Sequence, residues 1–283
     1  METLDLVVVG AGMYYRRTLM SCIVLEGGEM LTGWAGLAGL CAAKTYHQLN
    51  PTENVAIIEA NPSLGGVWSK ERLYPSLKTN NMLGTYEYAD FPMDTETYGV
   101  KPGEFMSGEV MHKYLSNYAA KFGIADKIRY QSKVLTAEHQ DGPDGGWTLT
   151  VQSGSSTSTI TARKLIMATG LTSEPFLPHF KGQEEFGAPL FHSKDFLRHA
   201  DTLNSSKVVT VFGTTKSAWD AVYAYGAKGI KVHWIIRGRS HIICRSNEIR
   251  SDMVPAESGH GPAWMAPPYV TPLKKWLEKL TRE

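Results

Sequence analysis

Leu6-Val-Val-Val9-Gly10-Ala-Gly12 is the stretch that decides the fold of this 283-residue chain. Its four leading apolar residues, three of them β-branched, predict a short buried strand that runs into glycines. A strand that ends in Gly-x-Gly and enters a helix is typical of a dinucleotide-binding turn. There the first glycine allows the tight turn and the second lets the backbone approach a pyrophosphate. The sequence therefore predicts an α/β fold that begins with a nucleotide-binding unit.

The third glycine of the Gly-x-Gly-x-x-Gly pattern is displaced. Residues 13–33 follow Gly12, and Gly36 then opens the small-residue stretch Leu37-Ala-Gly-Leu-Cys-Ala-Ala43. Without residues 13–33, Gly10, Gly12 and Gly36 form a complete fingerprint at the start of a helix. Two explanations stay open. The segment is a translated intron whose ends fit in-phase splice sites, or it is a genuine surface excursion, which loops tolerate at small entropic cost.

Composition sets broad bounds on function. The chain carries 29 basic and 28 acidic residues and is 42% apolar, an ordinary soluble composition with room for one large or two medium domains. The balanced charge gives no footprint for nucleic acid or an anionic membrane, and no apolar run reaches the ~18 residues of a membrane span. The amino end lacks a basic start, so no signal peptide is expected and a cytoplasmic location is the default. Cys22, Cys41 and Cys244 form no CxxC pair, which argues against a zinc site or a dithiol centre.

A second buried strand, 55–58, ends in a carboxylate, Glu59. Glu59 follows Gly36 at roughly the 20-residue interval expected for the acid that accepts the ribose hydroxyls of a dinucleotide. Shortly after it, Gly65-Gly66-Val-Trp68 places a glycine pair before an aromatic residue, which suits close approach of the backbone to a bound ring system.

The middle of the chain predicts an inserted β-meander. Residues 74–93 are interpreted as a loop, and 107–122 as a helix whose aromatic stripe packs on the core. Strands are expected at 128–135, 147–152 and 158–163, followed by a buried exit strand over 164–168 and a hinge over 171–178. The exit strand leads into Thr169 and Gly170. This pattern indicates a Rossmann-like three-layer fold with an inserted meander.

A second, partial dinucleotide-binding unit is expected from strand 207–213, helix 218–228 and strand 231–237. Its turn, Gly213-Thr-Thr-Lys216-Ser217, has Thr215 where a second glycine is usual. The strand after it ends in Arg237, which suits the 2′-phosphate of NADPH or is simply a solvated charge; both interpretations stay open. Residues 238–256 form a second in-phase candidate insertion. We expect a first domain over 1–172 and a truncated second domain over 173–283.

These motifs together resemble the flavin-containing monooxygenases, particularly fungal FAD-dependent members associated with secondary metabolism. The resemblance rests on the split fingerprint, GGVW, the segment from Thr79 to Pro92, Ala168-Thr-Gly170 and the GTTKS turn. The family motif F-x-G-x-x-x-H-x-x-x-[YW] is matched in relaxed form. Phe186 and His192 are kept, while Ala188 and Phe196 replace the glycine and the final aromatic residue.

The resemblance implies a flavin mechanism. NADPH would reduce FAD, O₂ would add to give a C4a-hydroperoxyflavin, and this would oxygenate a small organic substrate. Asn80 matches the family asparagine near the flavin peroxide, and Lys78-Thr79-Asn80 favours heteroatom oxygenation over Baeyer–Villiger chemistry. The predicted cofactor residues are Gly10, Gly12, Gly36, Glu59, Gly66, Trp68, Thr169, Gly170, Gly213, Lys216, Ser217 and Arg237.

Two other readings of the chain stay open. A truncated or mis-spliced chain would be a non-catalytic dinucleotide-binding fragment. A small NADPH–flavin reductase is disfavoured because no redox dithiol is present.

Overall fold

The structure, a computed structural model, describes residues 2–9, 37–84, 87–142, 145–170, 175–213 and 215–236. These residues divide into two compact units, the first within 1–77 and 108–206 and the second within 78–107 and 207–283. The predicted domain boundary at 172/173 and the predicted insertions 13–33 and 238–256 lie outside the described residues. They stay predictions.

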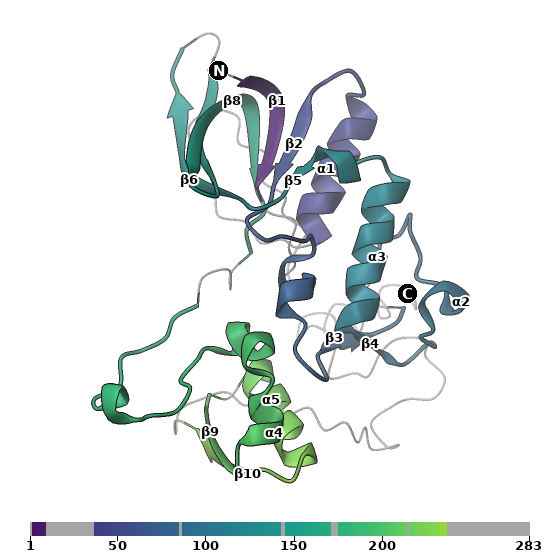
Figure 1. The fold of residues 1–283 in the computed structure, drawn as a ribbon. Helices are drawn as coiled ribbons and strands as arrows, with labels where there is room; N and C mark the ends of the chain where they lie inside the picture. The colour runs from purple at the N-terminus through teal and green to yellow at the C-terminus, as the bar shows by residue number, and fades with distance from the viewer. Residues whose placement is uncertain are drawn as a thin grey trace, which may run out of the picture. The chain divides into compact units, whose positions relative to one another are not determined.

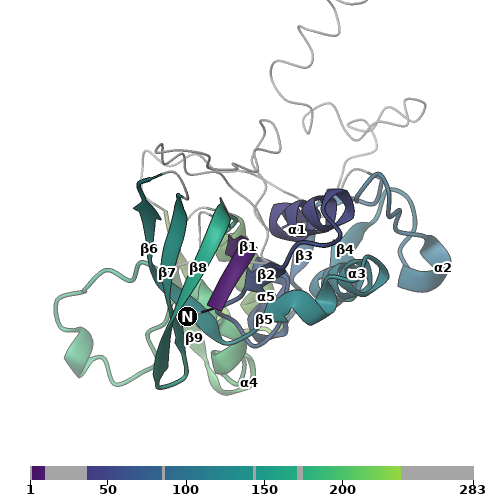
Figure 2. The ribbon, with the colours of Figure 1, turned by 90° about the horizontal axis from the view of Figure 1, so that it is seen from above.

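The first unit is built on a six-stranded sheet with the order β5-β2-β1-β8-β7-β6 (Figures 1 and 2). β1 pairs in parallel with β2 and β8, and β2 in parallel with β5; β8, β7 and β6 are successively antiparallel. The parallel half with its helices is the expected α/β core, and the antiparallel half is the expected meander. The strands are β1 Glu2–Val9, β2 Val55–Ile58, β5 Ile128–Arg129, β6 Ser132–Gln140, β7 Gly146–Ser153 and β8 Ser156–Met167.

Two helices accompany the parallel strands of this unit (Figure 2). Helix α1, Leu37–Leu49, contacts β1, β2 and β8 through small buried residues that include Ala38, Gly39 and Ala43, so its backbone packs closely on the sheet. Helix α3, Gly108–Lys121, buries the predicted aromatic stripe, including Tyr114 and Tyr118, each 0% exposed. The interpretation of that stripe as core is confirmed. Shorter turns are η1 Gly66–Trp68, η2 Lys70–Arg72, η3 Ala125–Lys127, η4 Gln183–Glu185, η5 Ser193–His199 and α4 Thr202–Ser205.

The structure changes the predicted meander in two places. The single strand expected over 128–135 is divided into β5 and β6, because Gln131 has a positive φ of 52° that breaks the extended backbone. The strands expected separately over 158–163 and 164–168 form one continuous strand, β8, which pairs with both β7 and β1. The strand therefore carries the chain from the antiparallel half of the sheet directly into the parallel half.

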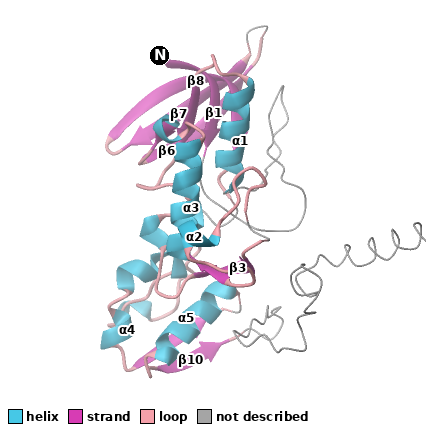
Figure 3. Cartoon of the chain, turned by 90° about the vertical axis from the view of Figure 1, so that its right-hand side faces the viewer, coloured by secondary structure: helices cyan, strands magenta, loops and turns pink. Residues whose placement is uncertain are grey.

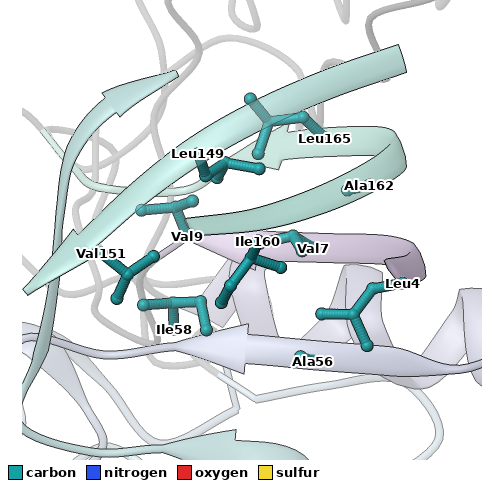
Figure 4. Packing of buried hydrophobic residues seen from close by; sticks show 10 residues of the cluster. All are labelled: Leu4, Val7, Val9, Ala56, Ile58, Leu149, Val151, Ile160, Ala162 and Leu165. Atoms are coloured by element: carbon teal, nitrogen blue, oxygen red, sulfur yellow. The ribbon is translucent and has the colours of Figure 1, made fainter. Parts of the chain in front are cut away.

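Hydrophobic side chains from four strands of the first unit form one core cluster (Figure 4). Val7 and Leu149 are 0% exposed, and Leu165 is 1% exposed. Burial on this scale contributes roughly 1.5–3 kcal/mol for each large apolar side chain, so the cluster holds the meander on the parallel strands. Its members are Leu4, Val7, Val9, Ala56, Ile58, Leu149, Val151, Ile160, Ala162 and Leu165.

Regular structure in the described part of the second unit lies within residues 78–107 and 207–236 (Figure 3). Residues 78–107 form an antiparallel pair, β3 Lys78–Met82 with β4 Phe105–Ser107, and the short helix α2 Thr95–Tyr98. The prediction of a loop over 74–93 is therefore wrong at β3. Residues 207–236 form β9 Val208–Phe212, α5 Lys216–Ala227 and β10 Lys231–Ile235, with β9 and β10 parallel. This βαβ unit agrees with the elements expected there.

An ion pair at the first strand makes stability depend on pH. Arg129 on β5 donates to both carboxylate oxygens of Glu2 on β1, with 2.7 Å between Nη1 and Oε2. The hydrogen bonds from Arg129 lower the pKa of Glu2. The stabilisation is therefore complete above the unfolded-state pKa of about 4.3 and is lost as the pH falls through the lower folded-state pKa.

We expect Glu2→Gln to remove this dependence. Both side chains are partly exposed, so the loss in free energy of unfolding at pH 7 should stay below about 1 kcal/mol. Urea unfolding at pH 7 and pH 3 measures it, with Glu138→Gln on the exposed surface of β6 as the control. An equal loss at both pH values would contradict the assignment.

Candidate functional site

Two of the predicted FAD residues of the first unit, Glu59 and Thr169, lie at one edge of its sheet. Val9, the last residue of β1, pairs in register with Ile58 of β2 and Met167 of β8, so these parallel strands end together. Glu59 and Thr169 follow at this edge. The backbone N–H of Ala168 donates to the Val9 carbonyl at 2.8 Å, which keeps the segment after β8 beside the end of β1. Ligands of open α/β sheets bind outside this carboxyl edge.

Gly10, Gly12 and Gly36 lie outside the described residues, as does Arg237. The described structure does fix their flanks, since β1 ends at Val9 and α1 begins at Leu37.

Glu59 is buried and held in a defined position. It is 3% exposed, and its Oε1 accepts from the backbone N–H of Asn61 at 2.9 Å and from Asn61 Nδ2 at 2.7 Å. Its own N–H donates to the Arg129 carbonyl, and its carbonyl accepts from the Ser132 N–H. A buried carboxylate fixed at the end of the second strand has the position and chemistry required to accept ribose hydroxyls.

The GGVW segment forms a compact turn that needs its glycines. Gly65 and Gly66 have φ of 114° and 60°, and a Cβ on Gly65 would lie 2.9 Å from the carbonyl carbon of Trp68. Trp68 is 5% exposed, and its carbonyl lies 3.0 Å from Nδ1 of His112 on α3. Burial lowers the pKa of His112, although the hydrogen bond to Trp68 opposes this, so the neutral imidazole with a proton on Nδ1 fits the contact. Helix α3 therefore helps to fix the turn.

The residues that follow β8 are less buried than Glu59 and Trp68. Gly170 has a φ of 75°, which only glycine adopts readily, and Thr169 is exposed. Both lie at the carboxyl edge where the predicted role beside the flavin would place them.

The residues of the relaxed family motif, 186–196, differ in how far they are buried. Phe196 is 2% exposed, and its ring centroid lies 5.5 Å from that of Tyr74, whereas Phe186 is 60% exposed. His192 caps η5 by accepting the Lys194 N–H at Nδ1 (3.1 Å), and burial lowers its pKa. The motif therefore packs onto the loop after GGVW through its last aromatic residue. The prediction from sequence missed Tyr74, and an aromatic residue directly before Pro75 is the signal that was available.

Asn80 lies on β3 of the second unit. Its neighbour Thr79 accepts the Met106 N–H at 3.0 Å, which fixes the strand. The Oδ1 atom of Asn80 is buried and makes no hydrogen bond within the described part of the chain. An unsatisfied buried amide oxygen costs free energy unless a ligand or water completes it. The residue therefore fits a role against a polar cofactor.

The predicted NADPH turn opens helix α5. Gly213 has a φ of 128°, and its carbonyl accepts from Trp234 Nε1 at 2.7 Å. Lys216 and Ser217 are the first two residues of the helix, and Lys216 forms an ion pair with Asp220 one turn later. The structure thus brings Gly213, Lys216 and Ser217 together at a strand-to-helix turn.

Two other classes of site find no support in the described residues. They contain no group of three or more His, Cys, Asp or Glu side chains that could hold a metal ion. Among the helices that the structure describes, none is long and apolar enough to cross a membrane.

Comparison with solved structures shows the fold. The chain matches an oxidized steroid monooxygenase bound to NADP with a TM-score of 0.60 and 22% identity, over 83% of this chain and 39% of that one. It matches the closed crystal structure of cyclohexanone monooxygenase with a TM-score of 0.62 and 18% identity, over 83% and 38%. The predicted fold class is confirmed, because both are monooxygenases of the same α/β architecture.

Comparison with sequences shows the family. A FAD-dependent monooxygenase of Pyrenophora dematioidea is 41% identical over 217 residues, or 74% of this chain and 39% of that protein. The FAD-dependent monooxygenase resA of Aspergillus sclerotiorum is 38% identical over 82% of this chain and 38% of its own length. This chain thus spans about two fifths of the length of these relatives. Residues 32–255 match the family model described as flavin-binding monooxygenase-like, and the chain belongs to that family.

Proposed function

We propose that this chain carries the cofactor-binding part of an FAD- and NADPH-dependent monooxygenase that acts on a small organic substrate with O₂. The observation that carries the proposal is the buried carboxylate of Glu59, fixed at the carboxyl edge where β1, β2 and β8 end together. Its relatives are named FAD-dependent monooxygenases, and a structural neighbour is titled as a complex with FAD and NADP.

The residues divide into two proposed cofactor sites. In the FAD site, Glu59 accepts the ribose hydroxyls, and the glycine fingerprint receives the pyrophosphate. The Gly66–Trp68 turn and Thr169-Gly170 adjoin the flavin. Asn80, on β3 of the second unit, is the proposed catalytic residue, and its buried amide oxygen makes no hydrogen bond within the described part of the chain. In the NADPH site, the backbone from Gly213 to Ser217 receives the pyrophosphate and Arg237 the 2′-phosphate. The cofactor-binding residues assigned are Gly10, Gly12, Gly36, Glu59, Gly66, Trp68, Thr169, Gly170, Gly213, Lys216, Ser217 and Arg237.

When bound, FAD would supply the redox chemistry, with NADPH as the reductant and O₂ as the oxidant, so that one oxygen atom goes to the substrate and the other to water. The protein's own side chains bind and orient the cofactors. The amide of Asn80 is the side chain proposed to meet the reacting ring, and a neutral carboxamide donates or accepts a hydrogen bond without changing charge. The Lys78-Thr79-Asn80 sequence supports heteroatom oxygenation as the reaction.

The experiment is a spectrum followed by a turnover assay. The purified chain is incubated with FAD and desalted, and its absorption is recorded near about 450 nm, where oxidised flavin absorbs. NADPH oxidation and O₂ uptake are then measured. Retained flavin without NADPH oxidation would favour the alternative, a non-catalytic dinucleotide-binding fragment. Absence of flavin binding under all conditions would contradict the proposed FAD site.

A further inference from the structure

The turn that follows GGVW carries polar groups that the proposed FAD residues do not account for. Its backbone is closed by hydrogen bonds from the Ser69 N–H to the Gly66 carbonyl (3.1 Å) and from the Arg72 N–H to the Ser69 carbonyl (2.9 Å). This turn, η2, contacts η5 of the family motif. Arg72 is thereby fixed between the GGVW segment and residues 193–199 of the first unit.

The guanidinium of Arg72 has no ion-pair partner in the part of the chain that the structure describes. It is partly buried, and within the described residues it forms neither a hydrogen bond nor an ion pair. The carboxylates that act on it from a distance are already engaged. Glu59 accepts from Asn61, and Asp195 pairs with Arg198 at 3.2 Å. Tyr74 and His192 complete the ionisable groups that face it.

This arrangement costs the unliganded protein free energy. Burial lowers the pKa of Arg72, and it outweighs the opposing effects of Tyr74, Glu59 and Asp195. Three residues earlier, the hydroxyl of Ser69 is completely buried and makes no hydrogen bond among the described residues. A guanidinium has five N–H donors and keeps its charge, so it needs an anion once water is removed. Two unsatisfied polar groups in one turn indicate a missing polar ligand.

We propose that Arg72 is a further cofactor-binding residue whose guanidinium binds the pyrophosphate of FAD. The inference rests on the proposed function, and geometry selects the chemical group. The carboxylate of Glu59, the proposed ribose acceptor, raises the pKa of Arg72 electrostatically, and Arg72 ends the turn η2 that follows Gly66–Trp68, the proposed flavin neighbours. In FAD the pyrophosphate joins the adenosine half to the flavin half. Arginine binds such oxygens with paired N–H donors, which suits a diphosphate.

The test compares Arg72→Met and Arg72→Lys with Arg198→Met, a control that removes an exposed arginine from the neighbouring η5. Binding of FAD and of ADP, which carries the diphosphate without the flavin, is measured by calorimetry at low and high salt. We expect Arg72→Met to lower the affinity for both ligands about tenfold and to reduce the dependence of binding on salt concentration. The affinities of Arg198→Met should stay within about twofold of those of the native chain. Arg72→Lys keeps the positive charge but loses the paired N–H donors of the guanidinium, so its affinities should lie between those of the native chain and of Arg72→Met.

Stability of the unliganded protein separates binding from a structural role. Because the guanidinium is partly desolvated and unpaired among the described residues, Arg72→Met should unfold at the same temperature as the native chain or higher. A lower unfolding temperature together with weaker binding would make Arg72 structural and overturn the inference. If the native chain binds FAD and Arg72→Met binds it equally well, the inference alone fails. If neither the native chain nor the chain without residues 13–33 binds either ligand, the proposed function fails as well.

Discussion

Glu59→Gln is expected to weaken FAD binding about 30-fold, which corresponds to about 2 kcal/mol. The carboxylate would accept charge-assisted hydrogen bonds from ribose hydroxyls, and a glutamine keeps one acceptor oxygen but presents an amide where an acceptor is needed. That remaining oxygen can still accept from Asn61, so the turn should hold its shape. Calorimetric titration with FAD measures the change.

Glu138→Gln is the matched control for this substitution. It makes the same chemical change on the exposed surface of β6, away from the carboxyl edge of the parallel strands, and should leave FAD affinity unchanged. Equal affinities for the native chain and Glu59→Gln would remove Glu59 from the site. Loss of affinity with a lowered unfolding temperature would instead point to the structural hydrogen bonds of Asn61.

Deleting residues 13–33 is expected to tighten FAD binding by about 100-fold, the second large effect. The deletion joins Gly12 to the residues before Gly36 and restores the fingerprint, so that several N–H groups at the helix start can meet the pyrophosphate, each worth about 1.5 kcal/mol or more. Full restoration should also require the part of the relatives that this chain does not span. FAD titration of both chains gives the ratio.

Deletion of residues 238–256 is the control for that experiment. This second candidate insertion follows the second nucleotide unit, so its removal should leave FAD affinity as it was. If deleting 13–33 leaves the dissociation constant unchanged, the segment is a tolerated loop and the intron hypothesis is wrong. If it abolishes binding, the segment itself takes part in the site.

Local sequence was enough to predict a helix or strand wherever a short pattern of residues is compatible with only one secondary structure. The apolar run at β1 can be buried only in a sheet core, and the stripe of α3 repeats at helical spacing. The sequence pattern did not predict the strands correctly where hydrogen bonding to a neighbouring strand decides whether a segment is extended. The sequence of β3, Lys-Thr-Asn-Asn-Met, shows no alternation of apolar and polar residues. It forms a strand because it pairs with β4, where Lys78 lies opposite Ser107 and Met82 opposite Phe105. The division of 128–135 likewise depends on β5 joining β2 while β6 joins β7.

The amino-acid sequence by itself determined the family, the α/β class and the place of Glu59 at the end of the second strand, because strand ends, glycines and acid recur at fixed spacings along the chain. Only the tertiary structure decided the surroundings of Arg72 and the packing of Phe196 on Tyr74. Phe196 and Asp195 lie more than a hundred residues along the chain from Tyr74 and Arg72, and no periodicity links them. Burial, the loss of water and the absence of a counter-ion are properties of the folded environment, and they exist only once distant segments meet.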